Sequence, residues 1–196
     1  FFDVGANIGI YSLYYAQSQE GNIYSFEPSA FNLRQLAKNV SVNNLSDRIT
    51  ILPNPLSDKT GAALFINGNE DEGGAMSAFG VDYGHDGNPI DKDIRYSVMG
   101  FSLDDLFDLN ILTEAPSLIK IDVDGIEHLI LKGAEKTLRS DTLKSLYIEV
   151  NDDFEAQAKQ VSATLHSAGF VLKEKRHGDM FGNTSTFNQI WVKEAK

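Results

Sequence analysis

The chain has 196 residues, 42% of them hydrophobic, which is enough for one substantial core, so we expect a single domain over residues 1–196. Its formal net charge of −11 argues against a general nucleic-acid-binding surface, because such surfaces are basic. The absence of cysteine excludes disulfides, thiolate metal sites and a thiol nucleophile, and no apolar run approaches the roughly 18 to 20 residues of a membrane span.

The start of the chain is predicted to form the end of a buried strand, a tight turn and the beginning of a helix. Phe2 and Val4 belong to the strand, residues 5–9 to the turn and residues 10–16 to the helix. A strand that runs into a glycine turn and then a helix presents free backbone N–H groups and the positive end of a helix dipole at one place. Such a place suits a nucleotide-like ligand.

This turn lies very close to the first residue. A natural start is not expected to place a ligand-binding turn so early, so we expect that an N-terminal portion is missing, together with any targeting segment. No signal peptide is visible, and a reducing compartment tolerates a chain without cysteine. We therefore expect a cytoplasmic protein.

The spacing of the two glycines in the turn distinguishes between ligands. A dinucleotide-binding loop has the pattern G-x-G-x-x-G, which lets the backbone approach a pyrophosphate. Here the spacing is Gly5-x-x-x-Gly9, and Asn7 takes the place of the second glycine. With Asp3 at the strand end, the turn fits a ligand that carries an ammonium and a carboxylate better than one that carries phosphates. S-adenosylmethionine (SAM) is such a ligand. The alternative is that the glycines only make a strand-to-helix turn.

A second strand is predicted over residues 23–26 and ends at Glu27 and Pro28. Glu27 lies about twenty residues beyond the glycine turn, where an acidic residue at the tip of the second parallel strand meets the ribose hydroxyls of an adenosine. A carboxylate can accept two hydroxyl protons at once. We therefore predict that Glu27 binds the ribose. The alternative is a solvated acid at a strand end.

The next elements are an amphipathic helix and two short strands. Apolar residues at helical spacing predict the helix over residues 30–43, with Ser29 as its N-cap. Strands are predicted over residues 49–52 and 62–66. Residues 54–58 follow the third strand, and we expect them near the adenine ring if the first three strands are parallel neighbours.

Regular patterning stops between residues 67 and 96, where acidic residues and glycines are frequent. About thirty residues without periodicity inside a compact domain usually form a functional lid or a disordered excursion. We expect a lid or insertion in which Met76, Phe79 and Tyr83 cover an organic acceptor. The alternative is that these side chains pack the segment against the core.

Alternating strands and helices complete the chain. A strand is predicted over residues 97–101 and a short helix over residues 102–107, with Ser102 as its N-cap. The later elements are a strand with its exit turn (117–125), a helix (126–139), a strand (146–150), a helix (154–168) and two strands (170–174 and 188–193). This order predicts an α/β fold with a doubly wound, Rossmann-like sheet, mostly parallel, with an antiparallel C-terminal hairpin at one edge.

Acidic residues gather at the predicted strand ends, which is where open α/β sheets bind ligands. Methyl transfer from a sulfonium requires in-line alignment and, for a hydroxyl acceptor, removal of a proton. Asp122 is our candidate for orienting or deprotonating the acceptor, and Glu127 is the second candidate for this catalytic role.

Other interpretations of this region stay open. Asp122 and Asp124 could simply cap the helix that follows them, or hold Mg²⁺. A calcium loop is contradicted by the strand-forming residues around them, and we assign no metal ligands. His128 is a further candidate base, as are His85 and His177, which fall in loops beside the expected cleft.

Several segments together resemble the FkbM family of SAM-dependent methyltransferases, which are class I and Rossmann-like. The segments are residues 2–9 (FDVGANIG), 26–28 (FEP), 36–44, 55–61 (PLSDKTG), 102–106 (SLDDL) and 120–134 (KIDVDGIEHLILKGA). The last of these is the most specific, whereas the opening turn alone matches many class I methyltransferases. The chain departs from the family at Asp124, where glutamate is more usual, and in its longer and more acidic segment 67–96.

The resemblance implies O-methylation of a hydroxyl on a sugar, polyketide or other small metabolite. It places Asp3, Gly5, Asn7 and Glu27 around SAM. The full set of cofactor-binding residues that we expect is Asp3, Gly5, Ala6, Asn7, Gly9, Ser12, Glu27, Pro28 and Ser57. Two alternatives remain: a nicotinamide-dependent oxidoreductase on the same sheet, against which Asn7 argues, and a non-catalytic cofactor-binding or scaffold domain.

Overall fold

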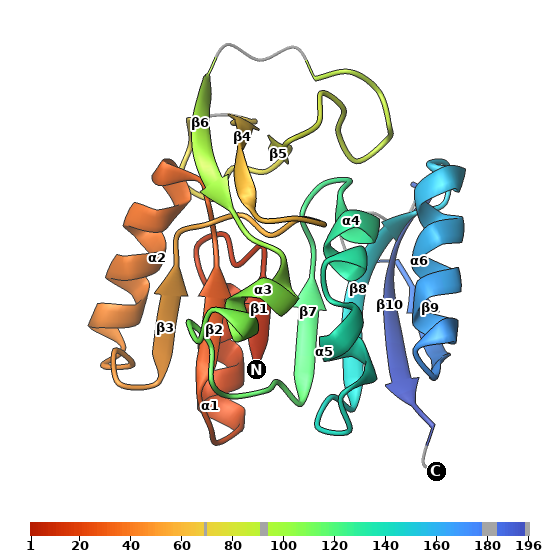
Figure 1. Ribbon diagram of the computed structural model, residues 1–196. Helices are drawn as coiled ribbons and strands as arrows, with labels where there is room; N and C mark the ends of the chain where they lie inside the picture. The colour runs from red at the N-terminus through yellow and green to blue at the C-terminus, as the bar shows by residue number, and fades with distance from the viewer. Residues whose placement is uncertain (69, 91–93, 178–183, 195–196) are drawn as a thin grey trace.

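The computed structural model describes residues 1–68, 70–90, 94–177 and 184–194. Its centre is a seven-stranded sheet with the order β3-β2-β1-β7-β8-β10-β9 (Figure 1). The strands are β1 (Phe2–Val4), β2 (Ile23–Phe26), β3 (Ile49–Leu52), β7 (Leu118–Ile121), β8 (Ser145–Asn151), β9 (Phe170–Arg176) and β10 (Thr186–Lys193). In this sheet β3, β2, β1, β7 and β8 are parallel, and β10 is antiparallel to both of its neighbours. The predicted α/β sheet with a C-terminal hairpin is therefore confirmed.

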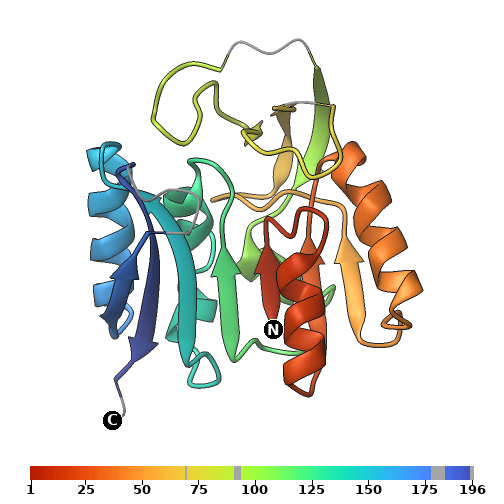
Figure 2. The same ribbon diagram turned by 180° about the vertical axis from the view of Figure 1, so that it is seen from behind.

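Helices cover both faces of this sheet. They are α1 (Ile10–Ser18), α2 (Ala30–Val42), α3 (Leu103–Asp108), α4 (Glu127–Lys132), α5 (Glu135–Arg139) and α6 (Glu155–Ser167). α3, α4 and α5 lie in front of the sheet in Figure 1, and α4 also contacts α6. α1 lies on the opposite face (Figure 2), where Ala16 packs with Leu36 and Val40 of α2 in a second core cluster. Two apolar layers thus hold the sheet from both sides.

The strand order reverses at β1, which pairs with β2 on one side and with β7 on the other. Chain connections leave the sheet in opposite directions at such a point, so a crevice forms outside the carboxyl ends of the two strands. Both strands are buried at their carboxyl ends: Val4 and Ile121 are each at most 2% exposed. The fold therefore fixes the position of whatever follows β1 and β7.

A smaller antiparallel sheet lies beyond this edge of the main sheet (Figure 1). Its strands are β4 (Gly61–Ile66), β5 (Ala78–Phe79) and β6 (Arg95–Gly100), in the order β5-β4-β6. The strands that we predicted over residues 62–66 and 97–101 are present, but they pair with each other rather than with the main sheet. The segment between them, which we expected to lack regular structure, contributes β5.

The helix predicted over residues 126–139 is wrong as a single element, because α4 and α5 are separated at Gly133 and Ala134. A Cβ atom on Gly133 would lie 2.1 Å from the backbone oxygen of Ser57. This close approach requires glycine, and glycine weakens a helix interior. Periodicity continues across the break, which is why the sequence did not reveal it.

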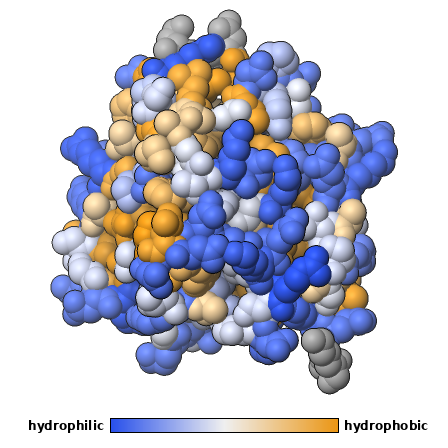
Figure 3. Space-filling model, in the orientation of Figure 1, coloured by the Kyte–Doolittle hydropathy of each residue, from blue (hydrophilic) through white to orange (hydrophobic). Residues whose placement is uncertain are grey.

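The described part of the chain contains no helix that is both long and apolar enough to cross a membrane. Hydrophilic residues cover much of the face drawn in Figure 3, with hydrophobic residues gathered in separate patches. Such patches are ordinary on a folded domain.

Candidate functional site

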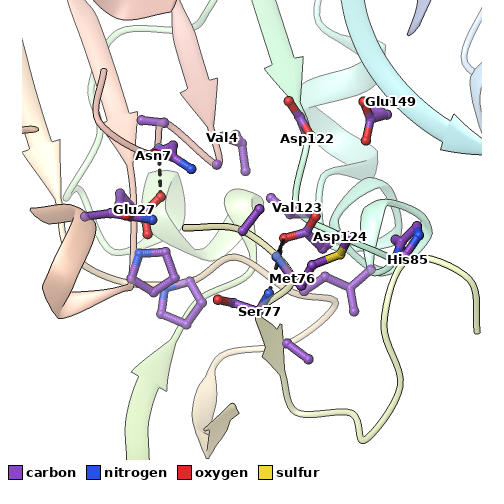
Figure 4. A pocket seen from close by; sticks show the side chains of 18 of the residues that line it. Val4, Asn7, Glu27, Met76, Ser77, His85, Asp122, Val123, Asp124 and Glu149 are labelled. Carbon is purple, nitrogen blue, oxygen red and sulfur yellow. Dashed lines mark hydrogen bonds between the residues drawn. The ribbon is translucent and has the colours of Figure 1, made fainter. Parts of the chain in front are cut away.

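A cavity of about 720 Å³ opens at the carboxyl ends of β1, β2, β7 and β8 (Figure 4). Residues from the β4–β5 connection and from β5 form its opposite wall. Of the predicted site residues, those that line it are Gly5, Ala6, Asn7, Glu27, Pro28 and Asp122. Within the part of the chain that the structure describes, the predicted residues outside its lining are Asp3, Gly9, Ser12, Ser57 and Glu127.

The turn after β1 packs closely against the end of β7. Gly5, Asn7 and Gly9 all have positive φ, at 77°, 52° and 91°. A Cβ atom on Gly5 would lie 1.9 Å from the backbone oxygen of Asp122, so only glycine fits there. The prediction of a tight glycine turn is confirmed, and the contact with β7 explains why it is so tight.

The backbone N–H groups of this turn are not free, which corrects our expectation. The amides of Gly5 and Ala6 both donate to the Phe26 carbonyl at 3.0 Å, and the Gly9 amide donates to the Ala6 carbonyl at 2.8 Å. The Asn7 amide donates to Glu27 Oε2 and the Ile8 amide to Asn7 Oδ1, both at 2.8 Å. A turn whose amides are already bonded offers little to a phosphate. This agrees with the argument from the glycine spacing against a pyrophosphate ligand.

Glu27 is held in place by the backbone around it. Its Oε2 accepts from Asn7 and its Oε1 from the Ser29 amide, each at 2.8 Å. The residue is only 5% exposed, so the alternative of a solvated strand-end acid is wrong. Burial raises the pKa of Glu27, and the two backbone hydrogen bonds oppose that shift. Each oxygen has a second lone pair, and the side chain lines the cavity beside Asn7 (Figure 4), so it is able to accept from a ligand.

Asp3 and Ser12 lie beneath the cavity rather than on its wall. Both are fully buried, and the Ser12 hydroxyl donates to Asp3 Oδ2 at 2.6 Å. Lys120 Nζ lies 3.4 Å from Asp3 Oδ1 and 3.4 Å from Asp122 Oδ2, and donates to the Gly5 carbonyl at 2.8 Å. Burial by itself lowers the pKa of Lys120, but the Asp122 and Asp3 carboxylates outweigh it and the net pKa is raised. A buried cation thus joins the ends of β1 and β7.

Asp122 and Glu127, our two catalytic candidates, occupy different positions. Asp122 lines the cavity at the end of β7. Glu127 lies behind the β7–α4 turn, where its carboxylate accepts from the amides of Val123 and Gly125 and from the side chain of Gln157. Neither Asp122 nor Asp124 caps α4, whose N-cap residue is Ile126. Glu127 therefore supports the turn that carries Asp122 and does not contact the cavity.

Replacing Glu127 by glutamine is expected to change how stability depends on pH. Between about pH 4.5 and about pH 7 the wild type should lose stability as the pH rises, whereas Glu127→Gln should not, so the variant gains relative to the wild type. Burial raises the pKa of Glu127 from 4.5 to about 7. A carboxyl with a raised pKa contributes stability that is complete below its unfolded-state pKa and is lost as the pH rises through the folded-state pKa. Urea unfolding across this window should show a relative gain of up to about 3 kcal/mol for Glu127→Gln. Glu155→Gln is the control, because Lys159 lowers the pKa of that exposed carboxyl. Parallel profiles for the wild type and Glu127→Gln would contradict the burial of Glu127.

Asp124 connects the main sheet to the segment that crosses the cavity. Its Oδ2 accepts from the Met76 amide at 2.6 Å and from the Ser77 amide at 3.2 Å (Figure 4). On the other side of the cavity, the Asn7 side chain donates to the Gly74 carbonyl at 3.1 Å. The segment is therefore fastened to both halves of the sheet edge. Of the three side chains that we expected in a lid, Met76 and Phe79 line the cavity and Tyr83 packs against the Phe154 ring.

No group of three His, Asp or Glu side chains suited to a metal ion occurs among the described residues. Asp122 is paired with Lys120, and Asp124 is bonded to backbone amides, so neither resembles a magnesium ligand. His85 lines the cavity, whereas His177 packs against the Phe187 ring and is outside the lining. His128 is also outside it, in contact with the Phe154 ring.

Tyr11 and Glu149 are among the lining residues to which the sequence analysis assigned no role in the site. Tyr11, in the first turn of α1, lies with its ring 5.0 Å from Lys120 Nζ. Glu149 lies on β8 and lines the cavity next to the end of β7. The signal for Glu149 was its position near the end of a predicted strand, but alternation along a strand does not say which residue near its end faces a ligand.

The family model described as the methyltransferase FkbM domain matches residues 3–172, and no curated protein matches the chain. The fold is similar to that of methyltransferase FkbM from Methylobacillus flagellatus KT, with 19% identity, a TM-score of 0.65 and coverage of 97% of this chain and 42% of that one. It is also similar to an rRNA methylase from Streptococcus thermophilus (14% identity, TM-score 0.57, coverage 99% and 86%). A third similar structure is a putative methyltransferase from Streptococcus mutans in complex with SAH, the product that SAM leaves after giving up its methyl group (12% identity, TM-score 0.56, coverage 98% and 87%). The chain spans less than half the length of the first of these proteins.

Proposed function

Because the chain belongs to the FkbM methyltransferase domain family, we propose that it transfers a methyl group from SAM to a hydroxyl group of a small-molecule acceptor. The methyltransferase class and SAM as the methyl donor follow from the family, which disfavours the nicotinamide-dependent oxidoreductase. That the methyl group goes to a hydroxyl group is the part that we propose. The observation that carries the proposal is that Glu27 and the turn after β1 line the same cavity at the point where the strand order reverses.

The residues present suit each part of SAM. Glu27 has free lone pairs beside the turn and is positioned to accept from the two ribose hydroxyls. Residues 54–56 line the cavity beyond Glu27 and offer a wall for the adenine ring. The turn after β1, with its amides already bonded, is left to hold the amino-acid end, which carries an ammonium and no phosphate. When bound, SAM supplies an electrophilic methyl carbon on a positively charged sulfur.

The acceptor end of the cavity is acidic. Asp122, Asp124 and Glu149 line the part that faces away from Glu27 (Figure 4). A carboxylate there is able to orient a hydroxyl and to take its proton. One similar structure is described as an rRNA methylase and another as a putative rRNA-methylase. An RNA acceptor, whose backbone is a chain of negatively charged phosphates, would be repelled by these acids and by the net charge of −11. A sugar, polyketide or other small metabolite with a hydroxyl group fits the site better.

Replacing Glu27 by alanine is expected to weaken SAM binding roughly a hundredfold, measured by isothermal titration calorimetry. The estimate, about 3 kcal/mol, assumes the loss of two charge-assisted hydrogen bonds to the ribose. Glu27→Gln keeps one acceptor oxygen, and we expect a smaller loss, of about tenfold. Thermal unfolding of both variants checks that the fold survives the loss of the bonds to Asn7 and Ser29. An unchanged affinity in Glu27→Ala would reject the ribose role.

Methyl transfer itself is tested by mass spectrometry of SAH, the demethylated product of SAM, after incubation with a panel of hydroxylated metabolites. Formation of SAH together with a methyl ether supports the proposal. Binding of SAM without transfer to any member of a broad panel would favour the non-catalytic alternative. Transfer to a nitrogen or carbon atom in place of a hydroxyl would keep the family assignment and reject the acceptor class.

A further inference from the structure

The carboxylates of Asp122 and Glu149 stand on neighbouring strands at the wall of the cavity (Figure 4). β7 and β8 are parallel, with Ile121 paired to Ile148, so the residues that follow these two are neighbours across the sheet edge. Any acceptor that enters the acidic end of the cavity therefore meets both carboxylates. Their surroundings differ, and the difference decides which one is able to take a proton.

Asp122 is already neutralised by a cation of the protein. Its Oδ2 lies 3.4 Å from Lys120 Nζ, and Lys120 is 3% exposed, so water screens this pair only weakly. The pair engages one of the two carboxylate oxygens and fixes the direction of the side chain. Asp122 is therefore suited to orienting the acceptor. Glu127 is excluded from contact with the acceptor because it lies behind the β7–α4 turn.

Glu149 has no such partner. Its carboxylate makes no hydrogen bond and no ion pair with the residues that the structure describes, although its backbone pairs within the sheet. The charged groups close enough to act on it are the carboxylates of Asp122 just after β7, of Asp124 in the following turn and of Glu127 at the start of α4, together with the cation of Lys120. On the other side of β8 it pairs with the uncharged Asn188 of β10. Burial, and then these carboxylates, raise the pKa of Glu149 to about 8.

We propose that Glu149 is the catalytic base that takes the proton from the acceptor hydroxyl. The proposal rests on the function proposed above. The hydroxyl oxygen forms a bond to the methyl carbon, the carbon–sulfur bond breaks with its electron pair going to sulfur, and the hydroxyl proton passes to the Glu149 carboxylate. Glu149 then returns that proton to water. Asp122, fixed by Lys120, orients the same hydroxyl.

A consequence of this assignment is measurable without knowing the acceptor. A carboxyl with a raised pKa is largely protonated in the free protein at neutral pH. A positive charge brought into the same cavity favours the ionised form of that carboxyl and lowers its pKa. Binding of SAM should therefore release the proton from Glu149, so that the base is ready when the acceptor arrives. SAH lacks the sulfonium charge and should release much less.

The test is isothermal titration calorimetry of SAM and of SAH in buffers that differ in their enthalpy of ionisation, which reports the number of protons released. For the wild type with SAM, we expect release of about half a proton at pH 8, more at pH 7 and almost none above about pH 9. Glu149→Gln should lose this release while still binding SAM. Asp86→Asn is the matched control and should release protons like the wild type, because hydrogen bonds from Asn88 lower the pKa of this exposed cavity carboxyl.

A second readout uses only the wild-type chain. Infrared difference spectra should show a protonated carboxyl band that disappears when SAM is added near pH 7 and persists when SAH is added. Equal proton release by Glu149→Gln and the wild type, or equal release with SAM and SAH, would overturn the assignment of Glu149 and leave the methyltransferase function standing. No binding of SAM at all would remove both.

Discussion

Replacing Gly5 by alanine is expected to destabilise the protein by more than about 4 kcal/mol and to abolish measurable SAM binding. Gly5 has a φ of 77°, which costs a residue with a side chain about 1 to 2 kcal/mol. The new Cβ would also lie 1.9 Å from the Asp122 carbonyl oxygen and 3.0 Å from Val123 Cγ1. Relief of that overlap requires the ends of β1 and β7 to separate, and large losses of stability come from such strain.

The matched control for this variant is Gly169→Ala. Gly169 follows α6 with a φ of 87°, and a Cβ atom there meets nothing within 4 Å. It therefore carries the same dihedral strain without the overlap, and we expect a loss of about 1 to 2 kcal/mol. Urea unfolding of the two variants and the wild type separates the two effects. Similar losses in both variants would show that the β1 turn does not press against β7 as described.

The sequence identified this turn but not its partner. A short glycine turn after a buried strand is a local signal, and it predicted both the tight turn and the nearby ligand site. The contact of Gly5 with the Asp122 carbonyl joins positions far apart in the chain, and only the pairing of β1 with β7 creates it. The same limit explains the free N–H groups that we expected, because the Phe26 carbonyl that occupies two of them belongs to β2.

The carboxylates show a second limit. The sequence placed acids at the strand ends, and Glu27 and Asp122 do line the cavity. It could not tell that Glu127 turns back to bond the β7–α4 turn, nor that Glu149 faces the cavity. Side-chain direction at a strand end depends on the backbone of the turn, where Gly125 has a φ of 125°. Hydrophobic periodicity does not carry that information.

The small sheet shows a third limit. Strand propensity correctly marked β4 and β6 as strands, but propensity does not say which strands pair. The sequence predicted the two strands without a pairing partner for either of them. β4 pairs with β6 across the long intervening segment. Met76 and Phe79, which we expected to cover the acceptor, do lie on the cavity wall, but the sequence did not show that β5 would pair with β4 there.

Replacing Lys120 by methionine is expected to destabilise the protein by about 3 to 5 kcal/mol, the usual cost of removing one partner from a buried ion pair. Lys120 is 3% exposed, and its ammonium forms ion pairs with the fully buried Asp3 and with Asp122. Methionine fills a similar volume, so the loss reports mainly the uncompensated charge of Asp3. SAM affinity should also fall, because Lys120 holds the Gly5 carbonyl at the base of the turn.

Two further variants isolate the electrostatic origin of this effect. Lys132→Met removes the exposed partner of Asp58, a pair 2.9 Å apart, and should cost less than about 1 kcal/mol. The double variant Lys120→Met/Asp3→Asn should recover part of the stability, since it removes both charges of the buried pair. Chemical unfolding of these variants, of Asp3→Asn alone and of the wild type gives the comparison. If the double variant were as unstable as the sum of its two single variants, the interaction between Lys120 and Asp3 would be negligible. The junction of β1 and β7 would then be held by strand pairing and packing, without a contribution from this buried ion pair.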